Sequence, residues 1–125
     1  MNAQSMAQRA YAQSAAPTKT DRRAEYETIA RATHELKAAA EKGATDFPGL
    51  AGALHNNNRL WTILAADVAD RDNPLPKDLK ARIFFLSEFT KRHSAQVLAK
   101  KATVVPLLEI NTAILRGLRN GSART

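Results

Sequence analysis

The sequence predicts an all-α fold, a small helical bundle of four to five helices. Apolar residues recur at helical spacing in four long segments of the 125-residue chain, and no segment shows sustained alternation of polar and apolar residues. Breaks containing proline or glycine separate these segments by the short connections that bundles use. We therefore expect a short N-terminal helix or flexible arm at 1–17, a single helical domain at 18–119 and a disordered tail at 120–125.

The first long helix is expected to begin at residues 18–20 and to stop at Gly43. Pro17 separates it from the preceding residues, because the residue before a proline resists helical angles. Thr18 and Asp21 have the spacing of a capping box, with Asp in place of the usual Glu. Glycine at position 43 favours the left-handed conformation that commonly ends a helix. The apolar stripe comprises Tyr26, Ile29, Ala30, Thr33, Leu36 and Ala40.

The second helix is expected to begin at residues 46–48, with Asp46 as the N-cap and Pro48 in the first turn. Its stripe comprises Leu50, Leu54, Asn57, Trp61, Leu64 and Val68. The segment from Asp70 to Pro76 breaks the pattern. Its Asn73-Pro74-Leu75-Pro76 stretch is most simply a turn followed by a proline helix start, and the alternative is an exposed docking loop.

The third helix is expected to begin near Pro76 and to end near Lys100 and Lys101, whose charges suit a helix C-terminus. One face comprises Leu79, Ile83, Leu86, Thr90, His93 and Val97, flanked by Phe85 and Phe89. The fourth runs from about Val104 or Pro106 to Leu118, and Gly117 marks its fraying end. The predicted core comprises Ile29, Leu36, Leu54, Trp61, Leu64, Leu79, Ile83, Leu86, Leu107, Ile114 and Leu118.

Composition excludes several classes of protein. The hydrophobic fraction of 44% favours a folded domain over disorder. The chain has no cysteine, which excludes disulfides, cysteine-ligated zinc and thiol nucleophiles and fits a reducing cytoplasm. No run of apolar residues approaches the length of a membrane span, and the first 16 residues lack the pattern of a signal peptide. We therefore expect a cytoplasmic protein without membrane insertion.

Positive charge is concentrated in the C-terminal part of the chain. Residues 1–76 carry nine basic and nine acidic side chains, whereas residues 77–125 carry ten basic and three acidic ones. Such an asymmetry favours an anionic partner, either nucleic acid or an acidic protein. The alternative is a solvated basic helix that only aids solubility, since an excess of charge specifies no geometry.

No pattern in the sequence recommends an enzyme, a metal site or a cofactor. The three histidines, His34, His55 and His93, have no second histidine or carboxylate at metal-ligand spacing. His93 is expected to be a hydrogen-bonded core or boundary residue. No glycine-rich phosphate loop, nucleophile elbow or paired acidic motif is present in the sequence.

Asn57 and Asn111 are polar amides on apolar helical stripes, and Asn57 lies four residues before Trp61, the single tryptophan. An amide in such a position is costly unless it is hydrogen-bonded. In a structural interpretation both amides are buried and satisfy neighbouring polar groups. In a functional interpretation they line a groove and bind a partner's backbone. Trp61 has the same two alternatives, a core anchor or an interface anchor.

An ordered set of residues resembles the flagellar biosynthesis regulator FlaF of alphaproteobacteria. The set begins with Ala53-Leu54, Asn57, Leu60-Trp61, Asp67, Asn73, Leu75-Pro76, Leu79 and Ala81, and continues with Leu86, Phe89, His93, Leu107, Ile110-Asn111, Ile114 and Gly117-Leu118. The resemblance covers about residues 8–119. The stretch Asn56-Asn57-Asn58 departs from it, because basic neighbours are expected around Asn57.

The resemblance implies a small cytoplasmic helical protein that promotes flagellin synthesis or secretion and acts with or against the regulator FlbT. Flagellin, whose terminal segments are amphipathic and poorly ordered before assembly, is the implied partner, bound by a chaperone or adaptor. Candidate contacts are Phe84, Phe85 and Leu108. The alternative is an RNA-binding regulator of flagellin translation, using Lys91, Arg92, Lys100 and Lys101. The sequence leaves the oligomeric state open.

Overall fold

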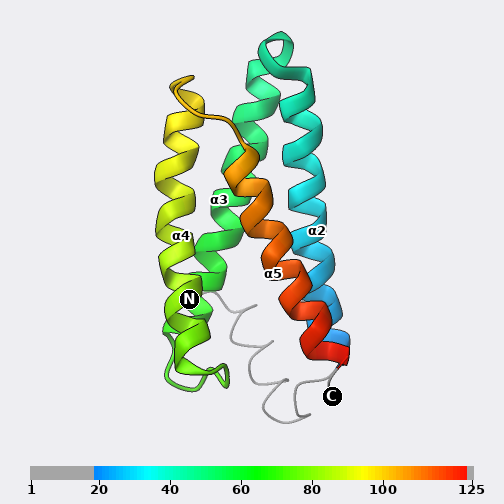
Figure 1. Cartoon of the computed structure of the whole chain (residues 1–125), viewed down its shortest axis with the longest axis vertical. Coiled ribbons are helices and arrows are strands. Elements are labelled where there is room, and N and C mark those ends of the chain that lie inside the picture. The colour runs from blue at the N-terminus through cyan, green and yellow to red at the C-terminus, as the bar shows by residue number, and fades with distance from the viewer. Residues whose placement is uncertain (1–18, 124–125) are drawn as a thin grey trace.

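Every regular element in the described residues is helical. The computed structural model of the chain describes the backbone of residues 19–123 and the side chains of residues 23–117. The elements are α2 (Lys19–Lys42), the 3-10 helix η1 (Gly43–Asp46), α3 (Phe47–Ala69), α4 (Lys77–Leu98) and α5 (Val105–Ala123) (Figure 1). The predicted all-α class is confirmed. The arm predicted at 1–17 lies outside the described residues, so the number of helices in the whole chain stays a prediction.

The junction between α2 and α3 has the two signals expected from the sequence. Gly43 has a φ of 55°, the left-handed conformation that ends α2. Asp46 then caps α3, because its Oδ1 accepts a hydrogen bond of 3.1 Å from the Gly49 amide. A Cβ at Gly49 would meet this carboxylate, so any other residue there would force the Asp46 side chain to shift. The capping box predicted at Thr18 lies outside the described residues.

The loop between α3 and α4 is a hydrogen-bonded turn. The Asn73 side chain donates from Nδ2 to the Asp67 carbonyl at 3.1 Å, and its Oδ1 accepts from the Leu75 amide at 3.0 Å. Pro76 directly precedes α4. Backbone amides at a helix start have no acceptor within the helix, so the lack of an amide hydrogen in proline costs no hydrogen bond there. The geometry of this loop is that of the turn and helix start predicted from its sequence.

Helix α4 ends at Leu98, before the two lysines expected to terminate it. Lys100 has a φ of 63°, and its amide donates to the Val97 carbonyl at 3.0 Å. The Lys101 amide donates to the Gln96 carbonyl at 2.9 Å, which completes a Schellman motif. The helix thus ends two residues before the expected position, and Lys100 occupies the left-handed position that is usually a glycine.

Lys100→Gly is expected to stabilise the fold by about 0.5–1 kcal/mol. Glycine adopts a positive φ without the steric cost that a Cβ imposes, and this gain exceeds the extra entropy of the unfolded chain. Lys101→Gly is the matched control and should destabilise, because among the described non-glycine residues only Lys100 has a positive φ. Urea unfolding of both variants tests the prediction, and a Lys100→Gly protein no more stable than the control would contradict it.

Helix α5 continues to Ala123, beyond the end expected at Leu118 and into the predicted tail. A glycine ends a helix only when it adopts the left-handed conformation, and Gly117 does not have a positive φ. Within a helix it costs only about 1 kcal/mol relative to alanine. The fraying end predicted at Gly117 is therefore absent.

The helices pack unequally. Helix α3 packs extensively on α4 and on α2, and α2 also packs on α5, whereas α4 and α5 have few contacts. Figure 1 shows α5 slanting away from α4 toward the N-terminal half of α2. One core cluster comprises Leu36, Ala53, Leu54, Val97, Val104 and Leu107. A second comprises Trp61, Val68 and Ile83.

The predicted core includes both fully buried residues and residues that are only half-buried. Six of its members are buried, namely Ile29, Leu36, Leu54, Trp61, Ile83 and Leu107. Four others are only half-buried against the second cluster, namely Leu64, Leu79, Leu86 and Ile114. All four pack against this cluster, from α3, α4 and α5, with part of each side chain exposed. The Leu118 side chain lies outside the described residues.

Candidate functional site

A hydrogen-bonded polar cluster, comprising Thr33, Asn57, Trp61 and Asn111, lies inside the bundle. Trp61 Nε1 donates to Asn111 Oδ1 at 2.9 Å. Asn111 Nδ2 donates to Asn57 Oδ1 at 2.8 Å and to Thr33 Oγ1 at 3.1 Å. The three largest side chains, those of Asn57, Trp61 and Asn111, are 0% exposed. The polar cluster therefore joins α2, α3 and α5, and a partner cannot reach its three largest side chains in this conformation, whereas Thr33 is half-buried.

The two asparagines are satisfied to different degrees. Asn111 accepts one hydrogen bond at Oδ1 and donates two from Nδ2, so it is the hub of the polar cluster. Asn57 accepts one hydrogen bond, but its buried Nδ2 has no partner in the structure. Both amides have the burial expected in the structural interpretation, and neither lines a groove. Burying such a network specifies which helix faces meet, because no other register would satisfy it.

The face of α4 that packs on α3 carries a stripe of small polar residues that was not predicted from the sequence. The buried side chains of α4 are Ile83, Ser87, Thr90, Ser94 and Val97. Ser87 Oγ donates to the Trp61 carbonyl at 3.2 Å. Ser94 Oγ lies 2.8 Å from Asn58 Oδ1 and 2.7 Å from the Thr90 carbonyl, so it donates to either acceptor. Thr90 Oγ1 has no partner in the structure.

The predicted α4 face shares Ile83, Thr90 and Val97 with the buried face but does not include Ser87 and Ser94. Hydroxyls that bond to backbone carbonyls can be buried at low cost. Ser87, Thr90 and Ser94 have helical spacing and lie between the buried residues Ile83 and Val97. This spacing is the sequence pattern that could have indicated their burial. Small side chains at these positions explain the close packing of α4 on α3.

Two predicted contact residues lie together on the solvent side of α4. Phe84 is 50% exposed and Phe85 is 61% exposed. Phe89, one turn after Phe85, is half-buried and its ring stacks on His93 with centroids 5.4 Å apart and planes 16° apart. The third candidate, Leu108, does not join them, because it lies on α5 and packs against the first core cluster.

A shallow depression adjoins these aromatic residues. It has a volume of about 280 Å³ and is lined by Phe89, Arg92, His93 and Gln96. The His93 ring is fixed from two sides, by its stack on Phe89 and by a hydrogen bond of 2.7 Å from Nε2 to the Thr103 carbonyl. This confirms His93 as a hydrogen-bonded boundary residue. The orientation of the His93 ring, which lines the depression, is therefore fixed by contacts within the protein.

The four basic candidates are exposed but do not act alike. Lys91 Nζ lies 4.0 Å from Glu88 Oε1, and Lys100 Nζ lies 5.9 Å from the centre of the Phe47 ring. Both lysines remain exposed, so each of these contacts contributes little free energy. Arg92 lines the depression, and Lys101 lies in the loop after α4. Two of the four candidates thus already contact groups of the protein itself.

Within the described side chains, no group of three or more histidine, aspartate or glutamate residues is placed to hold a metal ion. None of the helices in the described residues is both long enough and apolar enough to span a membrane. The exposed aromatic residues and the depression beside them make the solvent face of α4 the candidate site, with the polar cluster as the interior support of the bundle.

The residues of the family resemblance mostly have structural roles. Asn57, Trp61 and Asn111 form the polar cluster, and Asn73 and Leu75 form the turn before α4. Pro76 precedes α4, Leu60 is half-buried on α3, and Gly117 is exposed on α5. Their pattern therefore specifies helix packing and turn geometry.

The chain was compared with known protein families, curated proteins and solved structures. The family model described as flagellar protein FlaF matches residues 7–118. This stretch contains nearly all of the described helices and every residue of the polar cluster. No curated protein and no solved structure matches the chain.

Proposed function

Since the chain belongs to the FlaF family of flagellar proteins, we propose that it is a non-enzymatic regulator of flagellum biosynthesis that binds flagellin as a secretion chaperone or adaptor. Its site of action in this proposal is the cytoplasm, where flagellin awaits export. The regulator FlbT is a further partner that the family resemblance suggests.

The observation that carries the proposal is the exposure of Phe84 and Phe85 on one helix. Leaving a phenylalanine in water forgoes about 1.5–3 kcal/mol of burial free energy. Adjacent exposed aromatic residues on a protein surface are typical of an interface that a partner covers. An amphipathic segment of flagellin has the apolar stripe that such a surface would bind.

An RNA-binding regulator of flagellin translation is the rival function. The exposed charge of Arg92 and Lys101 favours it, but the carboxylate of Glu88 lies beside Lys91 and lowers the net positive charge of that surface. The two functions differ in their dependence on salt. Binding to RNA should weaken steeply as salt rises and should not depend on Phe85, because phosphate contacts release counterions.

Phe85→Ser is expected to weaken binding to monomeric flagellin by about tenfold or more, since truncation of an aromatic anchor at an interface commonly has an effect of this size. Val105→Ser is the matched control, because Val105 is 51% exposed but lies at the start of α5. Isothermal titration calorimetry measures both affinities. Equal affinities for the two variants would contradict the role of α4, and absence of binding by the unaltered protein at tens of micromolar would contradict the function itself.

A further inference from the structure

The solvent face of α4 has a symmetric pattern of charge and aromatic groups. Phe85 and Phe89 lie one turn apart, Arg82 precedes Phe85 by three residues, and Arg92 follows Phe89 by three. Spacings of three, four and three residues place all four side chains on one face of a helix. The aromatic pair is thus bracketed by two guanidinium groups whose positions lie about 15 Å apart along the helix axis.

We propose, on the basis of the flagellin-binding function above, that this face binds an amphipathic α-helix whose apolar stripe is bracketed by two acidic side chains. The partner helix lies along α4 with its apolar side chains on Phe85 and Phe89. Each acidic side chain forms an ion pair with one arginine. Guanidinium groups favour carboxylates because the two planar groups form paired hydrogen bonds.

The solvent face of α4 includes the shallow depression beside Phe89. Phe89 and His93 form its apolar side, and Arg92 and Gln96 are its polar side. A partner residue that places an apolar side chain on the aromatic wall brings a neighbouring carboxylate within reach of Arg92. The stack and hydrogen bond that hold His93 reduce the ordering that binding would require.

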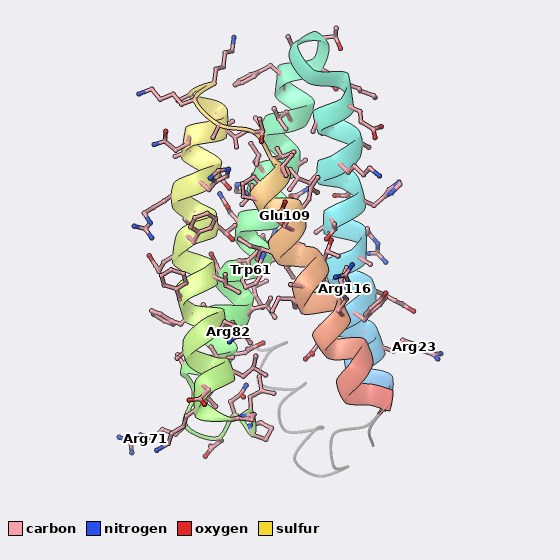
Figure 2. The ribbon with its side chains drawn as sticks, in the orientation of Figure 1. Arg23, Trp61, Arg71, Arg82, Glu109 and Arg116 are labelled. Atoms are coloured by element: carbon pink, nitrogen blue, oxygen red, sulfur yellow. The ribbon has the colours of Figure 1, made fainter. Side chains whose placement is uncertain are left out.

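The charge of α4 selects an acidic partner. The helix carries five basic and two acidic side chains, a net charge of +3. Its one ion pair within the described residues, between Lys91 and Glu88, leaves Arg82 and Arg92 without a carboxylate partner in that part of the chain. Figure 2 labels Arg82 on α4, the helix whose sequence also contains Phe85 and Phe89.

A second copy of this chain fits the face poorly. In a two-fold antiparallel pairing of two α4 helices, Phe85 of each copy would meet Phe89 of the other. The same symmetry would then place Arg82 of each copy against Arg92 of the other. In an antiparallel pair the residue three positions before Phe85 faces the residue three positions after Phe89. Two like-charged contacts would oppose the apolar contact.

The test uses two synthetic helical peptides with the same leucine stripe. One peptide carries two glutamates ten residues apart that bracket the stripe, and the other carries lysines at those positions. Fluorescence anisotropy should show that the protein binds the acidic peptide about tenfold or more tightly at low salt. The variant Arg82→Glu/Arg92→Glu should reverse this preference.

The matched control is Arg71→Glu/Arg116→Glu, which changes net charge equally at exposed positions on the α3–α4 turn and on α5 (Figure 2). It should keep the preference for the acidic peptide. A protein without that preference, or a control that loses it equally, would overturn the proposal. So would a dimer, seen by sedimentation, that Phe85→Ser dissociates.

A binding experiment with flagellin distinguishes failure of this inference from failure of the proposed flagellin-binding function. Displacement of bound flagellin by the acidic peptide alone supports both. If flagellin binds and neither peptide is preferred, the inference fails and the function stands. If flagellin does not bind and the acidic peptide is preferred, the function fails and the binding preference of α4 stands.

Discussion

Asn111→Ala is expected to lower the free energy of unfolding by about 3–5 kcal/mol. The substitution removes the hub of the polar cluster and leaves Trp61 Nε1 and Asn57 Oδ1 without partners in the interior. Each buried polar group left unpaired costs about 1–3 kcal/mol, and the lost volume adds to this. The melting temperature of a domain of this size should fall by about 10–20 °C.

Asn57→Ala is the internal comparison and should cost only about 1–3 kcal/mol. It leaves one amide hydrogen of Asn111 unpaired, but it also removes the Asn57 Nδ2 group that has no partner. Urea unfolding followed by circular dichroism gives both values. If Asn57→Ala proved as costly as Asn111→Ala, the assignment of Asn111 as the hub would be wrong.

The helices and most of their ends could be predicted because their signals are local. Gly43, Asp46 and Pro76 act through backbone geometry within one turn of the chain, so each is readable in isolation. The exact end of α4, two residues before the expected one, could not be predicted in this way. Lys100 adopts the left-handed conformation although its residue type disfavours it, and two backbone hydrogen bonds stabilise it there.

The burial of Asn57 and Asn111 could be anticipated, but their contact could not. Periodicity assigns a residue to a face of its own helix and does not say which faces meet. The hydrogen bond between the two amides spans 54 residues of sequence. The buried stripe at Ser87 was missed for a related reason, since its hydroxyl is satisfied by a carbonyl on another helix.

The exposed aromatic residues could be predicted only in part. Phe84 and Phe85 cannot both face the interior, because adjacent positions on a helix diverge by about 100°. That argument identifies an exposed candidate but does not show that both are exposed, as they are here. Leu108 seemed equivalent in sequence and lies against the core, because α5 packs chiefly on α2.

Trp61→Ala is expected to bring the protein close to unfolding under native conditions. Trp61 is 0% exposed and is the largest member of the second core cluster, so its truncation leaves a cavity worth about 3–5 kcal/mol. Loss of its Nε1 donor leaves Asn111 Oδ1 unpaired, at a further cost of about 1–3 kcal/mol. The combined loss approaches the whole stability of about 5–15 kcal/mol that small domains have.

Trp61→Phe separates the two contributions to this loss. Phenylalanine retains most of the buried ring but cannot donate to Asn111, so this variant should lose about 1–3 kcal/mol and remain folded at low temperature. Circular dichroism must report both transitions, because Trp61 is the single tryptophan of the chain. Adding Asn111→Leu to Trp61→Phe should cost less than Asn111→Leu alone, since the donor that the leucine would leave unpaired is already absent. Equal costs in the two backgrounds would show that the indole nitrogen and the amide are not energetically coupled, and the polar cluster would then owe its stability to packing rather than to its hydrogen bonds.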